Sequence, residues 1–325
     1  MDKLILGFSQ QLKAAIEIGR KVELTPQLFD IRNVVIAGLG GSGIGGTIVN
    51  ELVFGKIKVP ITVVKNYQLP EFVNEHTLLI TCSYSGNTEE TMHALEDGIN
   101  RKAKIVCVTS GGAMEQLAKK AGLDCVLIPS GMPPRSCIGY SLIQLLYVLF
   151  HYRLIDSGFE EGAKASIKLL DKNEFRIQKE AKKIAKKLNK KFPIIYACSG
   201  FEGVAIRFRQ QLNENAKVLV SHNMIPEMNH NELVGWTEKG KYAVVIIRNE
   251  MDYERNQMRI AINKEVISKY AKSIIEIKSK GNSFIENTIY LIHITDWASF
   301  YLAELRKVDA VEVKVIDYLK GELGK

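Results

Sequence analysis

Three hydroxyl side chains surround one glycine in the stretch TCSYSGNTEET, residues 81–91. The hydroxyls belong to Ser83, Ser85 and Thr88, and the glycine is Gly86. The apolar run before them predicts a buried strand, and the pattern after them predicts a helix with Thr88 as its N-cap. A helix N-terminus attracts anions, and hydroxyl donors without a lysine favour a phosphomonoester over a nucleoside triphosphate. The alternative is that these hydroxyls only cap the N-terminus of the helix and bind no ligand.

A second loop with possible chemistry is GLGGSGIGG, residues 38–46, between a predicted strand and a predicted helix. Its glycines match the GxGxxG spacing of dinucleotide-binding loops. That fold also needs Asp or Glu at the end of the second strand, where Lys65 and Asn66 stand instead. No Gly-Lys-Ser/Thr of a triphosphate-binding loop follows. The glycines therefore either allow tight strand–helix packing or let a small ligand approach the backbone, with Ser42 as a further hydroxyl.

The elements that position these loops must fit a chain of 325 residues, of which 46% are hydrophobic and 25% charged. This is typical of a globular protein with two domains. The formal net charge is +8, and much of it comes from lysines at 163–191 that alternate with apolar residues at helical spacing. We interpret them as a solvated helix face rather than a nucleic-acid surface, because no aromatic residues or binding motif accompany them. A basic chain can also steer anionic substrates inward.

The cysteines and the apolar stretches indicate in which cellular compartment the protein is expected and whether it spans a membrane. The five cysteines are odd in number and form no CxxC pair, so they indicate neither a disulfide framework nor a zinc site. We expect reduced thiols and a cytoplasmic location. Residues 1–13 lack the architecture of a signal peptide, and the apolar stretch 138–150 is too short for a membrane span and predicts a buried helix. We expect no membrane and no nucleic-acid partner.

Short apolar runs alternate with helical patterns along the whole chain. The predicted strands are 34–38, 61–65, 77–81, 104–109 and 124–129 in the first half, and 193–200, 217–222, 242–248 and 273–281 in the second. Apolar strands separated by helices predict doubly wound parallel sheets. We therefore predict an α/β fold with two related domains, 1–158 and 159–325, joined through the lysine-rich helix. The tail from residue 293 predicts helix almost throughout.

Five motifs in order carry a resemblance to a known family. SYSGNTEET resembles the phosphate-binding signature of sugar isomerase (SIS) domains. Together with GLGGSGIGG, SGMPPRSCIGYSL, LNENAK and PEMNHNELVGW, it resembles the bifunctional phosphoglucose/phosphomannose isomerases, from about residue 34 to the C-terminus. The resemblance implies two SIS-type, flavodoxin-like α/β/α sandwiches. It also implies an aldose–ketose isomerase that interconverts glucose 6-phosphate and mannose 6-phosphate with fructose 6-phosphate through a cis-enediol, without metal or cofactor.

The resemblance assigns roles in phosphate binding that agree with the loop chemistry described above. The implied phosphate-binding residues are Ser83, Ser85, Thr88 and Ser42, and the implied substrate loop contains Gly40 and Gly41. Anchoring the remote phosphate would position the reactive carbons.

The resemblance also implies the catalytic groups. Glu214 matches the base that moves a proton between C1 and C2, although the residues alone do not distinguish it from Glu202 or Glu227. His230 matches the ring-opening residue, contributed by the partner subunit of a homodimer. His222 is the competing histidine.

Two cations complete the implied site. Arg135 matches the arginine that stabilises the enediolate. Lys320 matches the C-terminal lysine, and Lys314 is the alternative. A metal site built from His222, His230 and Glu232 does not fit standard zinc spacing.

Three other activities are weighed. The isomerase half of a glucosamine-6-phosphate synthase requires a glutaminase domain with an N-terminal cysteine, which we do not expect before MDKLILG. Another SIS phosphosugar isomerase is a second alternative. A non-catalytic SIS sensor would keep the hydroxyl loop but would not need Glu214, Arg135 and His230, all of which are present.

Overall fold

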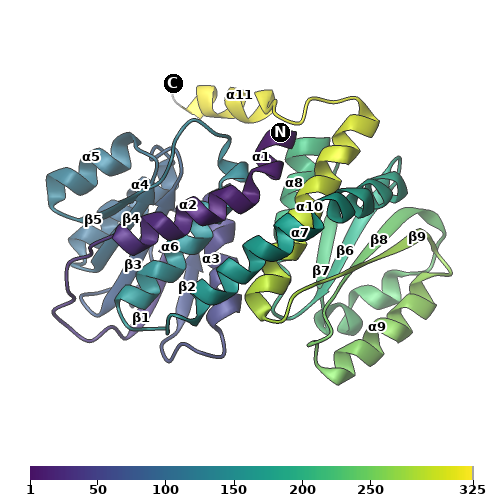
Figure 1. The fold of residues 1–325 in the computed structure, drawn as a ribbon, viewed down its shortest axis with the longest axis horizontal. Helices are drawn as coiled ribbons and strands as arrows, with labels where there is room; N and C mark the ends of the chain where they lie inside the picture. Colours follow the sequence, from purple (N-terminus) through teal and green to yellow (C-terminus); the bar gives the residue numbers. More distant parts are fainter. Residues whose placement is uncertain (324–325) are drawn as a thin grey trace. The chain divides into compact units, whose positions relative to one another are not determined.

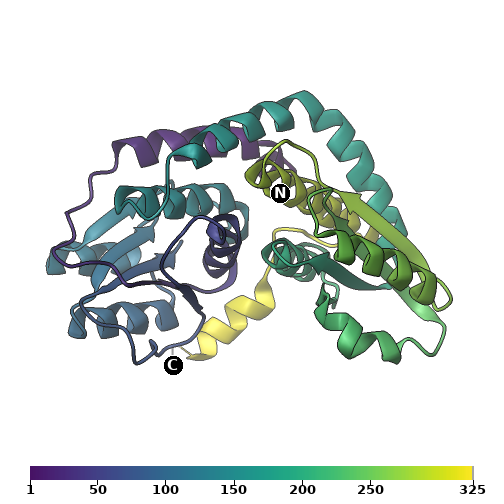
Figure 2. The ribbon, with the colours of Figure 1, turned by 90° about the horizontal axis from the view of Figure 1, so that it is seen from below.

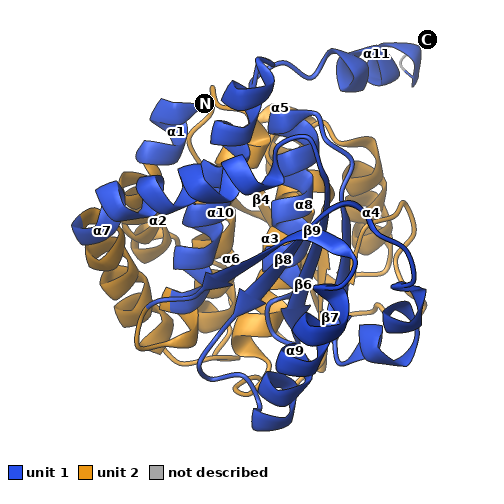
Figure 3. Cartoon of the chain, turned by 90° about the vertical axis from the view of Figure 1, so that its right-hand side faces the viewer, with its two compact units in different colours: residues 1–6, 172–280, 287–325 blue, residues 7–171, 281–286 orange. Residues whose placement is uncertain are grey.

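The structure, a computed structural model, describes residues 1–323 and divides into two compact units (Figure 3). Unit 2 contains residues 7–171 and 281–286. Unit 1 contains residues 1–6, 172–280 and the chain from 287 onward. One boundary between the two units, after Asp171, lies inside the long helix α7 (Gly158–Leu188). The predicted domain boundary between residues 158 and 159 stays a prediction.

Unit 2 is built on a parallel sheet with the strand order β2-β1-β3-β4-β5 (Figure 1). The strands are β1 (Asn33–Ala37), β2 (Ile61–Val64), β3 (Thr77–Ser83), β4 (Lys104–Thr109) and β5 (Asp124–Leu127). Every residue of β3 is buried, as expected for a central strand covered on both faces. All five strands coincide with runs predicted from the sequence.

Helices cover both faces of this sheet. The helices of unit 2 are α2 (Phe8–Lys21), α3 (Gly40–Val53), α4 (Glu89–Asn100), α5 (Gly112–Ala121), η1 (Pro134–Ser136), α6 (Ile138–His151) and the first part of α7. On one face, Leu95 of α4 and Met114 of α5 pack against Leu79 and Cys107 of the sheet. On α3, a Cβ at Gly46 would lie 2.8 Å from a side-chain atom of Ile36 in β1, which shows how closely this helix approaches the sheet.

Two helices near the start and middle of the chain lie side by side in unit 2. Figure 2 shows α2 along the beginning of α7. Arg20 pairs with Glu160, and the Lys13 ammonium lies 3.4 Å from the Asp171 carboxylate, so the two helices run antiparallel. The predicted buried helix is confirmed as α6, in which the residues from Ile138 to Leu149 are all buried.

Unit 1 has its own parallel sheet, in the order β7-β6-β8-β9 (Figure 1). The strands are β6 (Phe192–Cys198), β7 (Ser221–Ile225), β8 (Gly240–Arg248) and β9 (Ala271–Lys278). The remaining elements are α1 (Asp2–Leu6), α8 (Glu202–Ala216), η2 (Glu227–His230), η3 (Glu232–Gly235), α9 (Glu254–Ile267), α10 (Phe284–Arg306) and α11 (Lys314–Leu323). Ile260 and Ile267 of α9 pack on one face of this sheet. The α/β prediction with two parallel sheets is confirmed.

Two boundaries differ from the predictions. The strand predicted at 217–222 is β7 at Ser221–Ile225, because α8 extends to Ala216 and Lys217 adopts a left-handed conformation with φ +53°. Leu219, which suggested a strand, is 80% exposed. The predicted helical tail is interrupted at 307–313, where Lys307 has a φ of +58°. Among residues 1–323, no helix is long and apolar enough to cross a membrane.

Candidate active site

The hydroxyl loop lies where the sequence predicts it, between the end of β3 and the start of α4. Ser83 is 1% exposed, and its Oγ lies 2.8 Å from Thr88 Oγ1, so one hydroxyl donates to the other. Thr88 is the N-cap in backbone position, but its hydroxyl bonds to Ser83 instead of capping α4. The exposed Ser85 accepts a hydrogen bond from the Asn87 backbone N–H at 3.2 Å. These hydroxyls therefore lie at a helix N-terminus, where an anion is favoured.

Gly86 holds this loop against the loop that follows β4. Its φ is +68°, and a Cβ at this position would lie 1.8 Å from the carbonyl oxygen of Gly111. The Gly86 carbonyl accepts from the N–H of Met114 at 2.9 Å, and Asn87 Oδ1 accepts from the N–H of Ala113 at 3.0 Å. Only glycine fits this approach, so the two loops form one rigid support for the hydroxyls.

The structure shows one of the two roles that the sequence left open for the glycine loop, tight strand–helix packing, and the other, approach of a ligand, stays a prediction. A Cβ at Gly43 would lie 2.2 Å from the Gly38 carbonyl oxygen, so these two glycines allow tight strand–helix packing. Gly40 instead has a φ of +51° and open space beside it. Ser42 Oγ accepts the backbone N–H of Tyr84 at 3.1 Å and so joins the glycine loop to the hydroxyl loop.

Arg135 lies on the short helix η1 beside the glycine loop. A Cβ at Gly41 would be 3.1 Å from the Pro134 carbonyl, which shows how closely the two segments meet. The Tyr84 hydroxyl donates to the Pro129 carbonyl at 3.0 Å and accepts from the Met132 N–H at 3.1 Å. Burial raises the pKa of Tyr84 to about 12, so it keeps its proton at neutral pH. Arg135 itself is 5% exposed.

Unit 2 thus brings together one group of the predicted residues. It contains the hydroxyls of Ser83, Ser85, Thr88 and Ser42, the glycines Gly40 and Gly41, and Arg135. The cavity beneath the loops, lined by Ser42 and Tyr84 among others, measures about 10 Å³, room for about one water molecule. The support under the predicted phosphate site is therefore densely packed.

Glu214 lies in the last turn of α8 in unit 1 and is half-buried. The rival glutamates, Glu202 and Glu227, are exposed. The rotation of α8 is fixed by buried polar bonds to α10. Arg207 Nη2 donates to Asp296 Oδ2 at 2.6 Å, and Asn215 Nδ2 donates to Ser299 Oγ at 2.9 Å.

His230 ends the short helix η2 and is exposed. A partly buried network, missed in the sequence, fixes the segment that follows it. The Tyr196 hydroxyl donates to Glu232, and Asn223 Nδ2 donates to the other oxygen of Glu232 at 2.6 Å. Trp236 Nε1 donates to the Tyr196 hydroxyl at 3.2 Å. Tyr196 of β6 and Asn223 of β7 thus hold the segment 232–236, which follows His230, through its Glu232 and Trp236.

The competing histidine and lysine differ from the predicted ones in their surroundings. Burial, helped by the charge of Arg209, lowers the pKa of His222, which favours its neutral form. Lys320 lies on α11, no residue of which is buried, while the Lys314 ammonium lies 3.4 Å from the Glu312 carboxylate. Glu214, His230 and Lys320 all belong to unit 1.

The loop after β8, residues 249–253, occupies the place in unit 1 that the hydroxyl loop occupies in unit 2. β3 pairs with β1, the first strand of its sheet, as β8 pairs with β6, and each loop leads from its strand into a helix. Here the Asp252 carboxylate accepts the Asn249 backbone N–H at 3.0 Å. Burial raises the pKa of Asp252. The two equivalent loops therefore differ in chemistry, with hydroxyls in one and a carboxylate in the other.

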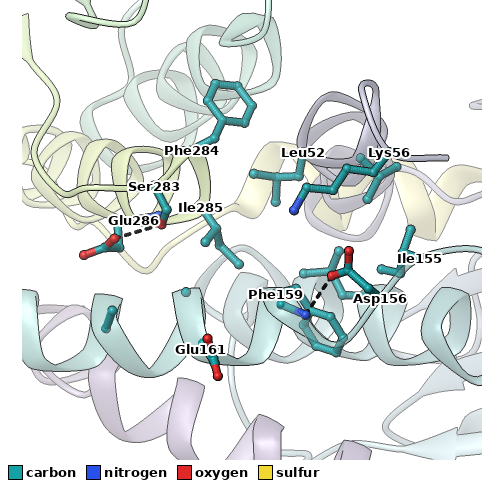
Figure 4. A pocket seen from close by; sticks show the side chains of 15 residues that line it. Leu52, Lys56, Ile155, Asp156, Phe159, Glu161, Ser283, Phe284, Ile285 and Glu286 are labelled. Atoms are coloured by element: carbon teal, nitrogen blue, oxygen red, sulfur yellow. Dashed lines mark hydrogen bonds between the residues drawn. The ribbon is translucent and has the colours of Figure 1, made fainter.

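A further cavity in unit 2, of about 340 Å³, has apolar walls that include Leu52, Phe159 and Ile285 (Figure 4). The predicted site residues do not line it. Two of its three carboxylates have structural partners, since Asp156 accepts the Gly158 N–H at 2.8 Å and Glu286 accepts the Ser283 hydroxyl at 2.8 Å. Across residues 1–323, no group of three or more His, Cys, Asp or Glu side chains could hold a metal ion.

The chain is similar to proteins of known name over its whole length. Residues 177–323 match the family described as the bacterial phospho-glucose isomerase C-terminal SIS domain. A bifunctional phosphoglucose/phosphomannose isomerase from Caldicellulosiruptor bescii is 39% identical, covering 100% of this chain and 99% of the relative. A protein of the same name from Aquifex aeolicus is 34% identical over 99% of this chain and 98% of the relative.

A solved structure supports the fold. The C-terminal domain of glucosamine-fructose-6-phosphate aminotransferase from Francisella tularensis matches with a TM-score of 0.76 at 13% identity, covering 95% of this chain and 97% of that chain. This agrees with the predicted pair of SIS-type domains.

Proposed function

The chain belongs to the family of bifunctional phosphoglucose/phosphomannose isomerases, and we propose that it interconverts glucose 6-phosphate and mannose 6-phosphate with fructose 6-phosphate. The observation that carries the proposal from the structure is the pair of hydroxyls, Ser83 and Thr88, at the N-terminus of α4. They offer neutral donors to a phosphate ester, in the same unit as the loop of Arg135.

In the proposed mechanism the phosphate is anchored first. Ser83, Ser85 and Thr88 donate to its oxygens at the end of α4, with Ser42 next to them. The open space beside Gly40 leaves room for the ligand at the backbone. Binding energy from this remote group then positions C1 and C2 for reaction.

Ring opening and proton transfer follow. His230 moves a proton between the ring oxygen and the C1 hydroxyl, which gives the open-chain aldose. Glu214 takes the proton from C2 and a cis-enediolate forms. The proton on the C2 hydroxyl passes to the C1 oxygen, and Glu214 returns its proton to C1 to give the ketose. Arg135 and Lys320 stabilise the negative charge of the enediolate.

We propose that the enzyme is a homodimer in which His230 acts in the site of the partner subunit. The exposure of His230, at the end of η2 and two residues before the fixed Glu232, supports such a role. The five cysteines, all within residues 1–323, form no disulfide, and we propose a reducing cytoplasmic compartment on the grounds of their odd number and spacing. There the reaction would serve glycolysis and gluconeogenesis without metal or cofactor.

The test is turnover of fructose 6-phosphate in the presence of EDTA, with glucose 6-phosphate and mannose 6-phosphate detected separately. Glu214→Gln removes the proposed base and keeps the shape of the side chain. We expect it to lower kcat by at least about a hundredfold, the usual effect of losing a general base. Glu202→Gln, an exposed glutamate at the other end of α8, is the matched control and should retain activity.

The other outcomes identify the alternatives. A wild-type protein that binds fructose 6-phosphate but forms neither aldose phosphate would be a sensor. Loss of activity with EDTA would contradict the metal-free mechanism. Equal losses in Glu214→Gln and Glu202→Gln would remove Glu214 from its assigned role.

A further inference from the structure

Lys217, the residue that follows α8, forms an arrangement that the proposed mechanism does not use. Its ammonium donates to the carbonyl oxygens of Glu214 at 2.7 Å, Asp309 at 2.6 Å and Glu312 at 2.7 Å. Three acceptors match the three N–H donors of an ammonium group. One acceptor lies in the last turn of α8, and two lie in the linker 307–313 between α10 and α11. We call this arrangement the carbonyl clasp.

The backbone conformation of Lys217 is unusual for a lysine, but it does not by itself set Lys217 apart from other lysines of the chain. Its φ of +53° is left-handed, a conformation that glycine adopts at a helix end without steric cost. Lys102, Lys190 and Lys307 also have positive φ, so a lysine in this conformation is common in the chain and shows nothing by itself. The three carbonyls are what distinguish Lys217.

Arg306 forms a second contact at the end of α8. Arg306, the last residue of α10, donates from Nε to the Ala216 carbonyl at 2.9 Å and from Nη2 to the Lys217 carbonyl at 3.4 Å. The end of α10 is therefore held at the end of α8. The linker then passes Lys217 before α11 begins at Lys314.

We propose that Lys217 is a positioning residue, whose carbonyl clasp fixes the segment leading to Lys320 against the helix end that carries Glu214. This inference rests on the roles proposed above for Glu214 and Lys320. Lys217 acts through backbone carbonyls and needs no contact with the substrate. Loss of the clasp would release the linker while α8 stays in place through its bonds to α10.

The variant Lys217→Gly separates positioning from stability. Glycine accommodates the positive φ, so we expect the helix end to keep its conformation. The loss of the three hydrogen bonds should lower the melting temperature without unfolding the protein at the assay temperature. The clasp is lost, and we expect kcat to fall about ten- to a hundredfold, the scale of a small displacement of a catalytic group. KM should change much less, because the phosphate-binding hydroxyls lie in unit 2. Lys190→Gly, with the same backbone change after α7 at a φ of +59°, is the matched control.

A measurement independent of activity is amide hydrogen exchange. In Lys217→Gly, exchange should become faster in residues 307–313 and remain unchanged in β6 and β8. Unchanged exchange in the linker, or a kcat equal to that of Lys190→Gly, would overturn the proposal. A wild-type protein without isomerase activity would instead refute the proposed function, while the exchange result would still test the clasp. If Lys217→Gly does not fold, Lys217→Met, which removes every donor, is measured in its place, and retention of wild-type kcat would overturn the proposal.

Discussion

The hydroxyl pair at the end of β3 allows a quantitative prediction for Ser83→Ala. Ser83 Oγ and Thr88 Oγ1 are 2.8 Å apart, so while this bond lasts the pair has one proton left for an anion. Ser83 is 1% exposed, and water has little access to replace the missing oxygen. Alanine therefore removes one polar group from the predicted phosphate site without changing the backbone.

The expected size of the effect follows from the charge of the ligand. A hydrogen bond to a charged group contributes about 1.5–3 kcal/mol. Since about 1.4 kcal/mol corresponds to a factor of ten in binding, KM for fructose 6-phosphate should rise roughly ten- to 150-fold. The phosphate stays bound through the reaction, so kcat should change little.

The assay is steady-state isomerisation, with Ser110→Ala as the matched control. Ser110 lies in the neighbouring loop and donates to the Tyr84 carbonyl at 2.6 Å, so its loss tests general damage to the loops. A KM for Ser83→Ala equal to that of wild type would refute the phosphate assignment. A fall in kcat at constant KM would place Ser83 near the reacting carbons instead.

Two further predictions concern assembly and pH. If His230 acts across a dimer, mixing Glu214→Gln and His230→Ala subunits should restore about a quarter of wild-type activity, since half of the dimers would carry one intact site; heterodimers without activity would contradict this. Arg20 holds the pKa of Glu160 at about 2, below its ordinary value of 4.5. Their ion pair should therefore stabilise unit 2 above about pH 4.5 and be lost as the pH falls toward 2. The free energy of unfolding of wild type, from urea titrations, should fall more steeply over this range than that of Glu160→Gln, and parallel curves would contradict the assignment.

The parts of the fold set by local pattern were predictable from the sequence. Buried parallel strands consist of continuous apolar residues, which identified β1, β3 and β4 directly. The strand predicted at 217–222 was wrong in position because local apolar residues such as Leu219 indicate a strand equally well when they are exposed. The end of α8 depends on Lys217, whose left-handed conformation no propensity predicts.

The proximity of candidate site residues was predictable where these residues are close in sequence. Ser83 and Thr88 lie within one strand–turn–helix unit, and the structure places their hydroxyls in contact. Contacts between distant segments left no local signal. The bond between Tyr196 and Glu232 and the carbonyl clasp of Lys217 join residues that only the folded chain brings together. Of these, Lys217 could have been noticed, because it stands in the LNENAK motif.

Asp252 bears on which of the two equivalent loops, one after β3 and one after β8, can bind an anion. The loop after β8 has the position of an anion site, but its own carboxylate already accepts the Asn249 N–H there. A negative charge inside the chain competes with any phosphate at this place and repels it. The two loops therefore have the same topology, but only the hydroxyl loop of unit 2 offers neutral donors for the proposed phosphate site. If the phosphate binds at the site proposed in unit 2, it would therefore have only one of the two equivalent loops to bind to, and this would favour a single orientation of the sugar phosphate.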